Sequence, residues 1–229
     1  MRLAGFQKLT LLDFPGKAAC TAFTPGCNFR CPFCHNAGLA SSQAVQEVSQ
    51  EDVFSFLQRR RGLLDGLCLT GGEPTLQEGL AAFCRRVKAL SFSLKLDTNG
   101  SRPDVLSQLI EEGLVDYVAM DVKNGPSRYA QTAGVPGLDL GPIRESVVLL
   151  KQGRVPYEFR TTVVASLHDE ASLLEAAEWL RGAQAWFLQQ FVDSGGCFLN
   201  GLTAYSEEAL RALAETVRPI VPSVCVRGI

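Results

Sequence analysis

Three of the eight cysteines, Cys27, Cys31 and Cys34, stand close together in the chain, separated by three and then two residues. Clustered thiols usually bind a metal, and a four-iron–four-sulfur cluster is normally held by four thiolates. With no fourth cysteine nearby, three thiolates would leave one iron with an open position that a reactant could fill. Two other uses stay open: a zinc site with His35 as fourth ligand, and a disulfide with one thiol to spare.

Glycines and polar residues stand on or just after the predicted strands that follow this cysteine loop. They are Gly71, Gly72, Glu73 and Pro74; Asp97, Thr98 and Asn99; Asp121 and Lys123; Arg160; and Gln190. Taken singly, each has an ordinary explanation, such as a tight turn or a surface ion pair. Because the carboxyl ends of parallel strands meet at one edge, their coincidence on successive strands indicates one shared mouth.

Short apolar runs that alternate with longer amphipathic stretches must position these residues. The predicted strands are 18–23, 66–70, 91–97, 116–122, 157–164 and 185–190, and the predicted helices are near 50–61, 77–89, 103–112, 141–151, 170–181 and 207–217. This alternation indicates parallel strands joined by right-handed crossovers. Six units are too few for an eight-fold barrel, so we expect an α/β fold, a partial (β/α)6 TIM-like barrel with outer helices.

The composition is that of an ordinary globular domain. The chain has 229 residues, 46% of them hydrophobic and 20% charged, with a formal net charge of -2. This balance excludes a disordered chain and, lacking a basic excess, disfavours a nucleic-acid binder. No apolar run could span a membrane and no secretory signal is visible, so we expect no membrane partner and a cytoplasmic location. We expect one domain over 1–229, with its core at about 17–191 and a C-terminal helix and tail at 192–229.

The other five cysteines are scattered along the chain. Cys20 and Cys68 fall in predicted strands and Cys84 on a predicted helix, where cysteine usually serves as a small buried hydrophobe. Cys197 and Cys225 carry no sequence signal of a role. Because there is no further block of cysteines, we expect a single cluster.

The three-cysteine loop, Phe33 before its last cysteine and the Gly71–Pro74 motif together resemble the radical S-adenosylmethionine (radical SAM) superfamily. More narrowly, the chain resembles the activating proteins of glycyl-radical enzymes, and above all those of anaerobic ribonucleoside-triphosphate reductase. The segments that carry the narrower resemblance are 5–8, 12–17, 34–36, 96–100, 119–123, 158–162 and 189–191.

The resemblance implies a radical SAM oxidoreductase. Cys27, Cys31 and Cys34 would hold one 4Fe–4S cluster whose open iron binds S-adenosylmethionine, and one-electron cleavage of this cofactor would yield a radical that takes a hydrogen atom from a glycine of a partner enzyme. Lys123 would face the methionyl carboxylate. The other residues implied in cofactor binding are Phe33, His35, Asn36, Gly71, Gly72, Glu73, Pro74, Asp97, Thr98, Asn99, Asp121, Arg160 and Gln190.

Asp97 and Asp121 form a separate hypothesis. Two carboxylates that arrive from adjacent strands repel each other unless a cation or a proton lies between them. The resemblance implies that a monovalent cation can sit there; the alternative is that Asp97 only caps the loop before Gly100.

The resemblance also implies a flavodoxin or ferredoxin as electron donor and a glycyl-radical enzyme as partner. Two rival functions remain. One is a radical SAM enzyme that acts on a small molecule or on a different glycyl-radical enzyme. The other is a non-catalytic iron–sulfur or zinc binding module, which would leave the strand-end residues without a use.

Overall fold

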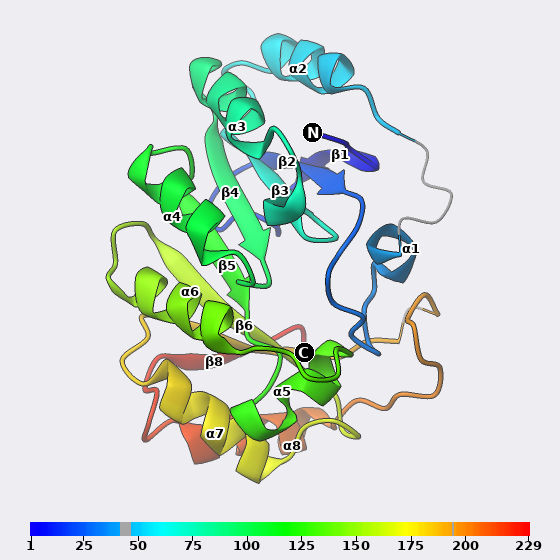
Figure 1. The fold of residues 1–229 in the computed structure, drawn as a ribbon, viewed down its shortest axis with the longest axis vertical. Coiled ribbons are helices and arrows are strands. Elements are labelled where there is room, and N and C mark those ends of the chain that lie inside the picture. Colours follow the sequence, from blue (N-terminus) through cyan, green and yellow to red (C-terminus); the bar gives the residue numbers. More distant parts are fainter. Residues whose placement is uncertain (42–46, 194) are drawn as a thin grey trace.

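The computed structural model describes residues 1–41, 47–193 and 195–229, and its centre is one eight-stranded sheet in the order β1 to β8 (Figure 1). Strands β2 to β8 are parallel, and β1 lies antiparallel to β2 at the edge. The strands are β1 Gly5–Thr10, β2 Ala19–Thr24, β3 Gly66–Gly71, β4 Ser93–Thr98, β5 Tyr117–Asp121, β6 Tyr157–Val163, β7 Trp186–Gln190 and β8 Val224–Arg227.

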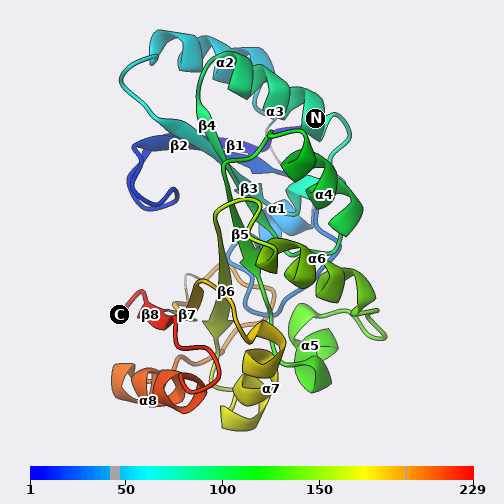
Figure 2. The same ribbon diagram turned by 90° about the vertical axis from the view of Figure 1, so that its left-hand side faces the viewer.

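Helices follow the parallel strands, and in Figure 2 α3, α4 and α6 lie along one side of the sheet, opposite the β1–β2 loop and the end of β8. Ser49, Asp169 and Ser206 begin three of the helices by accepting a hydrogen bond from a first-turn backbone N–H. The helices are α1 Ala37–Ala40, α2 Gln50–Arg59, α3 Leu80–Ala89, α4 Pro103–Glu111, α5 Pro126–Ala133, α6 Gly141–Lys151, α7 Glu170–Leu180 and α8 Glu207–Val217, with a 3-10 turn, η1, at Pro74–Leu76.

The sheet stays open, because its strand order is linear and no ladder joins β1 to β8 within the described residues. The predicted class, an α/β partial barrel of parallel strands with outer helices, is confirmed. The expected number of strands was too low, because β1 and β8 add one strand at each edge. Both are half exposed, and β8 has four residues, so neither shows the continuous apolar run of a central strand.

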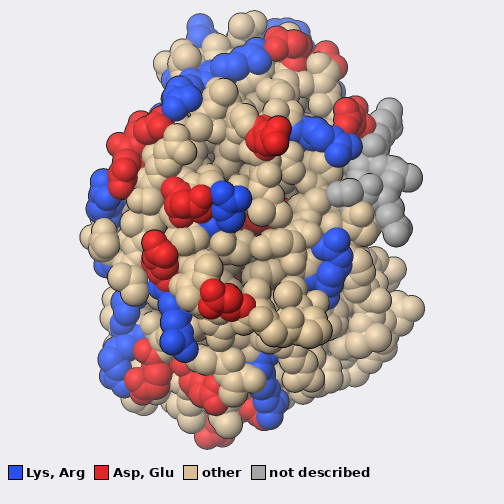
Figure 3. Space-filling model, in the orientation of Figure 1, with Lys and Arg blue, Asp and Glu red and all other residues tan. Residues whose placement is uncertain are grey.

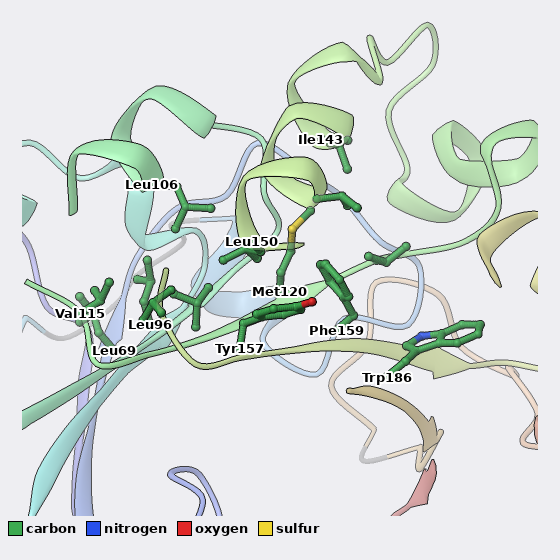
Figure 4. Packing of buried hydrophobic residues seen from close by; sticks show 14 of the residues in the cluster. Leu69, Leu96, Leu106, Val115, Met120, Ile143, Leu150, Tyr157, Phe159 and Trp186 are labelled. Carbon is green, nitrogen blue, oxygen red and sulfur yellow. The ribbon is translucent and has the colours of Figure 1, made fainter. Parts of the chain in front are cut away.

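Alternation along the central strands sends most apolar side chains to the helices and most charged ones to the opposite face. Leu96 of β4 and Met120 of β5 pack with Leu106 of α4 and Leu150 of α6 in the buried core (Figure 4). Each such buried side chain contributes roughly 2 kcal/mol of hydrophobic stabilisation. The residues one step along, such as Asp97 after Leu96, therefore point to the concave interior.

On the face shown in Figure 3, acidic and basic side chains are interspersed, and most of them lie over the helices on the upper and left-hand parts of the view. Among the described helices, none is both long enough and apolar enough to cross a bilayer.

Candidate active site

A cavity of about 450 Å³ opens at the carboxyl ends of β3, β4, β5, β6 and β7, beside the cysteine loop. The strand-end residues named from the sequence therefore share one mouth, with the exception of Pro74 and Gln190. The predicted residues that line it are Cys27, Cys31, Phe33, Cys34, His35, Asn36, Gly71, Gly72, Glu73, Asp97, Thr98, Asn99, Asp121, Lys123 and Arg160.

The cysteine loop is held in place by three segments that are distant from one another in the sequence. Helix α1 contacts the start of the loop, α5 contacts its middle, and residues 195–199 lie beside it. The loop and residues 195–199 are side by side in Figure 1. Phe29 and Phe33 fix it further because both rings are buried. The hydrogen bonds that anchor it run from Gly26 N to Leu39 O (2.8 Å), Cys27 N to Ala40 O (3.1 Å), Arg30 N to Ala133 O (2.9 Å) and Leu199 N to Pro32 O (3.0 Å).

Burial raises the pKa of the three clustered thiols, to about 11 for Cys31. The Lys123 ammonium lowers the pKa of each of the three thiols, so its positive charge acts on all of them. Without a bound metal the thiols are protonated at neutral pH, so loading a cluster must release protons.

The donor set suits a cluster better than a single ion. Within residues 1–41, 47–193 and 195–229, no three Cys, His, Asp or Glu side chains converge closely enough to hold one metal ion. A zinc ion needs such convergence, whereas each thiolate of a four-iron cluster binds a different iron. Three cavity-lining thiols on one loop therefore fit the cluster.

Asp97 and Asp121 are bridged by a side chain of the protein. The Arg160 guanidinium donates to Asp97 Oδ2 (3.2 Å) and to Asp121 Oδ1 (2.8 Å). Lys95 pairs with the other oxygen of Asp97, and Lys123 Nζ lies 3.1 Å from Asp121 Oδ2. Arg160 thus supplies the cation that two neighbouring carboxylates require.

These cations dominate the ionisation of Asp121. Burial disfavours its charge, but Arg160 and Lys123 outweigh burial and lower its pKa from 3.8 to about 2. Asp121 in turn raises the pKa of Lys123 above its ordinary value, despite the burial of that ammonium. Both groups stay charged at neutral pH, so the mouth offers a fixed cation beside the thiols.

The glycine pair after β3 allows two loops to touch backbone to backbone. A Cβ at Gly72 would lie 1.9 Å from Gly26 O, and Gly71 has a φ of +114°, which favours glycine. Gly72 N–H donates to Thr24 O and Glu73 N–H to Gly26 O, both at 2.8 Å. The glycines are therefore needed to position the cysteine loop. The carbonyls of this turn are the groups left for a ligand, although Gly71 O already accepts one hydrogen bond from Asn36 Nδ2.

Glu73 is buried and joins the ends of β3 and β4. Its carboxylate accepts from Thr75 N and Oγ1, from Thr98 Oγ1 (2.8 Å) and from Asn99 N (2.7 Å). Burial raises its pKa in spite of these donors. The side chain thus holds the β4 loop in position.

Two predicted residues lie outside the cavity. Pro74 is buried at the start of η1, and Gln190 donates to Tyr205 O (2.7 Å) on the other side of β7. Gln189 faces the cavity instead, as does Thr162 of β6, its partner in the ladder. The register that pairs Thr162 with Gln189 places this side chain in the cavity, and the sequence does not give that register. Asp13, Phe29, Ala40 and Thr70 also line the cavity without having been predicted.

The cysteines outside the loop are placed as follows. Cys20, Cys68 and Cys84 are fully buried, as expected, and burial raises the pKa of Cys20 and of Cys84 to about 12. Cys225 is exposed on β8, and Cys197 is partly buried in the segment beside the cysteine loop.

A second, smaller cavity of about 190 Å³ shares Asp97, Arg160 and Gln189 with the first. It reaches Glu158, whose buried carboxylate receives a two-point ion pair from Arg227 of β8, at 2.9 and 3.0 Å. The concave interior is therefore lined by paired charges from β4 to β8.

Comparison with known proteins places this site in a family context. A sequence model described as the Radical SAM superfamily matches residues 21–180. A relative from Methanocaldococcus jannaschii is 31% identical over 237 residues, which cover 99% of this chain and 96% of the relative. Its name assigns it provisionally to the glycyl-radical enzyme activating enzymes.

Two further proteins match only part of their own length. A probable GTP 3′,8-cyclase of Thermococcus kodakarensis is 29% identical over 199 residues, and the match covers 85% of this chain and 58% of that one. The solved structure of SuiB from Streptococcus suis, bound to precursor peptide SuiA, superposes with a TM-score of 0.72. That likeness covers 91% of this chain and 48% of the other at 14% identity, and it is a likeness of fold.

Proposed function

This chain belongs to the radical SAM superfamily and, within it, to the glycyl-radical enzyme activating enzymes, and we propose that it generates a glycyl radical on anaerobic ribonucleoside-triphosphate reductase. The observation that carries the proposal is a single cavity in which three loop cysteines meet polar groups from the ends of five successive strands. The choice of the reductase rests on the resemblance of the segments described above, 5–8, 12–17, 34–36, 96–100, 119–123, 158–162 and 189–191.

Cys27, Cys31 and Cys34 would hold a 4Fe–4S cluster. When bound, the cluster supplies one electron for cleavage of S-adenosylmethionine, which yields the radical that removes a hydrogen atom from the target glycine. The protein residues bind and orient the cofactor. Lys123 is suited to the methionyl carboxylate because Asp121 keeps it charged. The backbone carbonyls of Gly71, Gly72 and Glu73, which line the cavity, would accept from the methionyl ammonium.

The buried walls of the cavity exclude water from the radical. Phe29 and Phe33 close the side formed by the cysteine loop. Asn36 donates to Gly71 O (3.3 Å) and so links that loop to the β3 end. A monovalent cation beside Asp97 and Asp121 would have to share these carboxylates with Arg160, Lys95 and Lys123. A flavodoxin or ferredoxin would deliver the electron.

The test is anaerobic reconstitution with iron and sulfide, reduction with dithionite, and measurement of 5′-deoxyadenosine formed from S-adenosylmethionine. We expect about four irons per chain and 5′-deoxyadenosine from the wild type, and neither from the Cys31→Ala variant. The Cys225→Ala variant is the matched control, because Cys225 is exposed and does not line the cavity. A wild type that binds the cluster but yields no 5′-deoxyadenosine would contradict the proposal and favour a non-catalytic module.

A further inference from the structure

Asn99 is held rigidly at the end of β4, beside the cysteine loop. Its side chain is buried, and its Oδ1 accepts from Ser101 N (2.9 Å). Its own backbone N–H donates to Glu73 Oε2 (2.7 Å). With both the backbone and Oδ1 engaged, the orientation of the side-chain amide is fixed, and its NH₂ group must point toward the loop.

The NH₂ group of Asn99 meets two atoms of the cysteine loop. Nδ2 lies 2.9 Å from Asn28 Oδ1 and 3.8 Å from Cys27 Sγ. The backbone N–H of Phe29 is also directed at Cys27 Sγ, at 3.3 Å. Cys27 thus has two N–H donors, one from its own loop and one from a different strand.

A hydrogen bond to a ligating sulfur changes the reduction potential of an iron–sulfur cluster. The sulfurs carry more negative charge in the reduced state, so an N–H donor stabilises that state and makes the potential less negative. The donor from Phe29 is backbone and is present in every variant. The donor from Asn99 is the one that a substitution can remove.

We propose that Asn99 is a positioning residue that donates a hydrogen bond to the Cys27 thiolate and thereby raises the reduction potential of the cluster. The inference rests on the proposed function, because it requires Cys27 to be a cluster ligand. In this proposal the loop after β4 helps to determine the reduction potential of the cluster. Glu73 holds that loop in position by accepting from Asn99 N.

The experiment is a redox titration of the reconstituted protein followed by electron paramagnetic resonance, which reports the cluster potential without any turnover. Asn99→Ala removes the donor, and Asn99→Asp keeps the acceptor for Ser101 N while replacing the donor with a negative oxygen. We expect unchanged iron and sulfide content and a more negative midpoint potential in both variants, with the larger shift in Asn99→Asp.

Asn28→Ala is the matched control, because it breaks the bond between Asn99 and Asn28 but leaves the amide facing the sulfur. It also removes the Asn28 Oδ1 that lies 4.0 Å from Cys27 Sγ, but a ligating thiolate has no proton to donate to that oxygen. We expect this control to keep the wild-type potential. A wild-type potential in Asn99→Ala, an equal shift in Asn28→Ala, or loss of the cluster from both Asn99 variants would overturn the proposal and leave Asn99 a structural residue. A wild type that forms no four-iron cluster would instead remove the proposed function, and this inference with it.

Discussion

At the scale of single residues, Asp121 and Lys123 in the cavity each depend on their charged neighbours to stay ionised. Arg160 lies between Asp97 and Asp121, and Lys123 completes a row of alternating charges. Such a row is stable only when every member keeps its charge, since losing one leaves its partners buried and unpaired. The site is therefore sensitive to acid in a way that can be measured.

The Asp121→Asn variant tests this dependence. The pKa of folded Asp121 is about 2 and its ordinary value is 3.8, so the ionised carboxylate stabilises the fold above about pH 4. That contribution is lost as the pH falls toward 2. We expect Asp121→Asn to unfold more readily at pH 7 and to lose less stability than the wild type between pH 4 and pH 2, as measured by urea denaturation at each pH.

Asp52→Asn serves as the control for this experiment, because Asp52 is an exposed carboxylate on α2. It should reproduce the wild-type profile. Equal acid sensitivity of Asp121→Asn and the wild type would show that Arg160 and Lys123 do not depress the pKa of Asp121.

The residues of the site were largely predictable, because their types and spacing are chemical requirements. Three thiols on one loop and polar residues at successive strand ends need no tertiary information to be noticed. The choice between Gln189 and Gln190 did need it, because both are polar and a shift of one residue reverses the face of the strand. Glu73 was predicted as a cofactor contact, but its four hydrogen bonds to the β3 and β4 loops could be seen only in the structure.

At the scale of the elements, the turn after β3 is the most restrictive point. We expect Gly72→Ala to destabilise the protein by about 3 kcal/mol, because the added Cβ would overlap Gly26 O and must push the cysteine loop away. Thermal unfolding measures the effect, and iron uptake on reconstitution should fall with it.

Gly38→Ala is the matched control, since Gly38 lies in α1 near the same loop, has no positive φ and would place its Cβ in open space. It should be neutral or slightly stabilising, as alanine favours helix. If Gly72→Ala were as stable as Gly38→Ala, the turn after β3 would not be in close contact with the cysteine loop at Gly26.

Strand β8 was missed from the sequence, yet it completes the charge pairing inside the sheet. Arg227→Gln should cost about 2 kcal/mol, because among the described residues it leaves the buried Glu158 carboxylate with Tyr117 as its one side-chain donor. The double variant Glu158→Gln with Arg227→Gln should recover part of this loss. Urea denaturation of the wild type, the two single variants and the double variant gives the coupling energy between Glu158 and Arg227. Additive effects would mean that this ion pair contributes nothing to the stability of the protein.

The elements that were missed share a physical cause. β1 and β8 lie at the edges, where one side of the strand meets solvent and the apolar run is broken. Helix α5 is short and polar on its outer face, and α1 is a single turn. The central strands and long helices were predicted because burial on both faces, or on one helical stripe, leaves a clear pattern.

At the scale of the whole molecule, the chain matches its relatives over different shares of their length. It matches 58% of the length of the probable GTP 3′,8-cyclase, whereas it matches 96% of the Methanocaldococcus jannaschii relative. Within the described residues no ladder joins β1 to β8, and we expect a segment of another protein to reach the cavity through this open side.

The substrate class is therefore the prediction at this scale. The reconstituted protein, incubated with anaerobic ribonucleoside-triphosphate reductase and S-adenosylmethionine, should produce a glycyl-radical signal in electron paramagnetic resonance. With GTP in place of the reductase, we expect no cyclised nucleotide by mass spectrometry. Consumption of GTP, or no radical on the reductase, would contradict this choice of substrate.

The anchoring of the cysteine loop has a consequence for the life of the protein in the cell. Cys27, Cys31 and Cys34 leave the ribosome early, but Ala133 and Leu199, which hold their loop, are synthesised much later. During translation the loop therefore lacks two of its anchoring hydrogen bonds until residues 133 and 199 have been synthesised. We expect the loop to reach its final geometry, and with it full uptake of iron and sulfide, only in the completed fold.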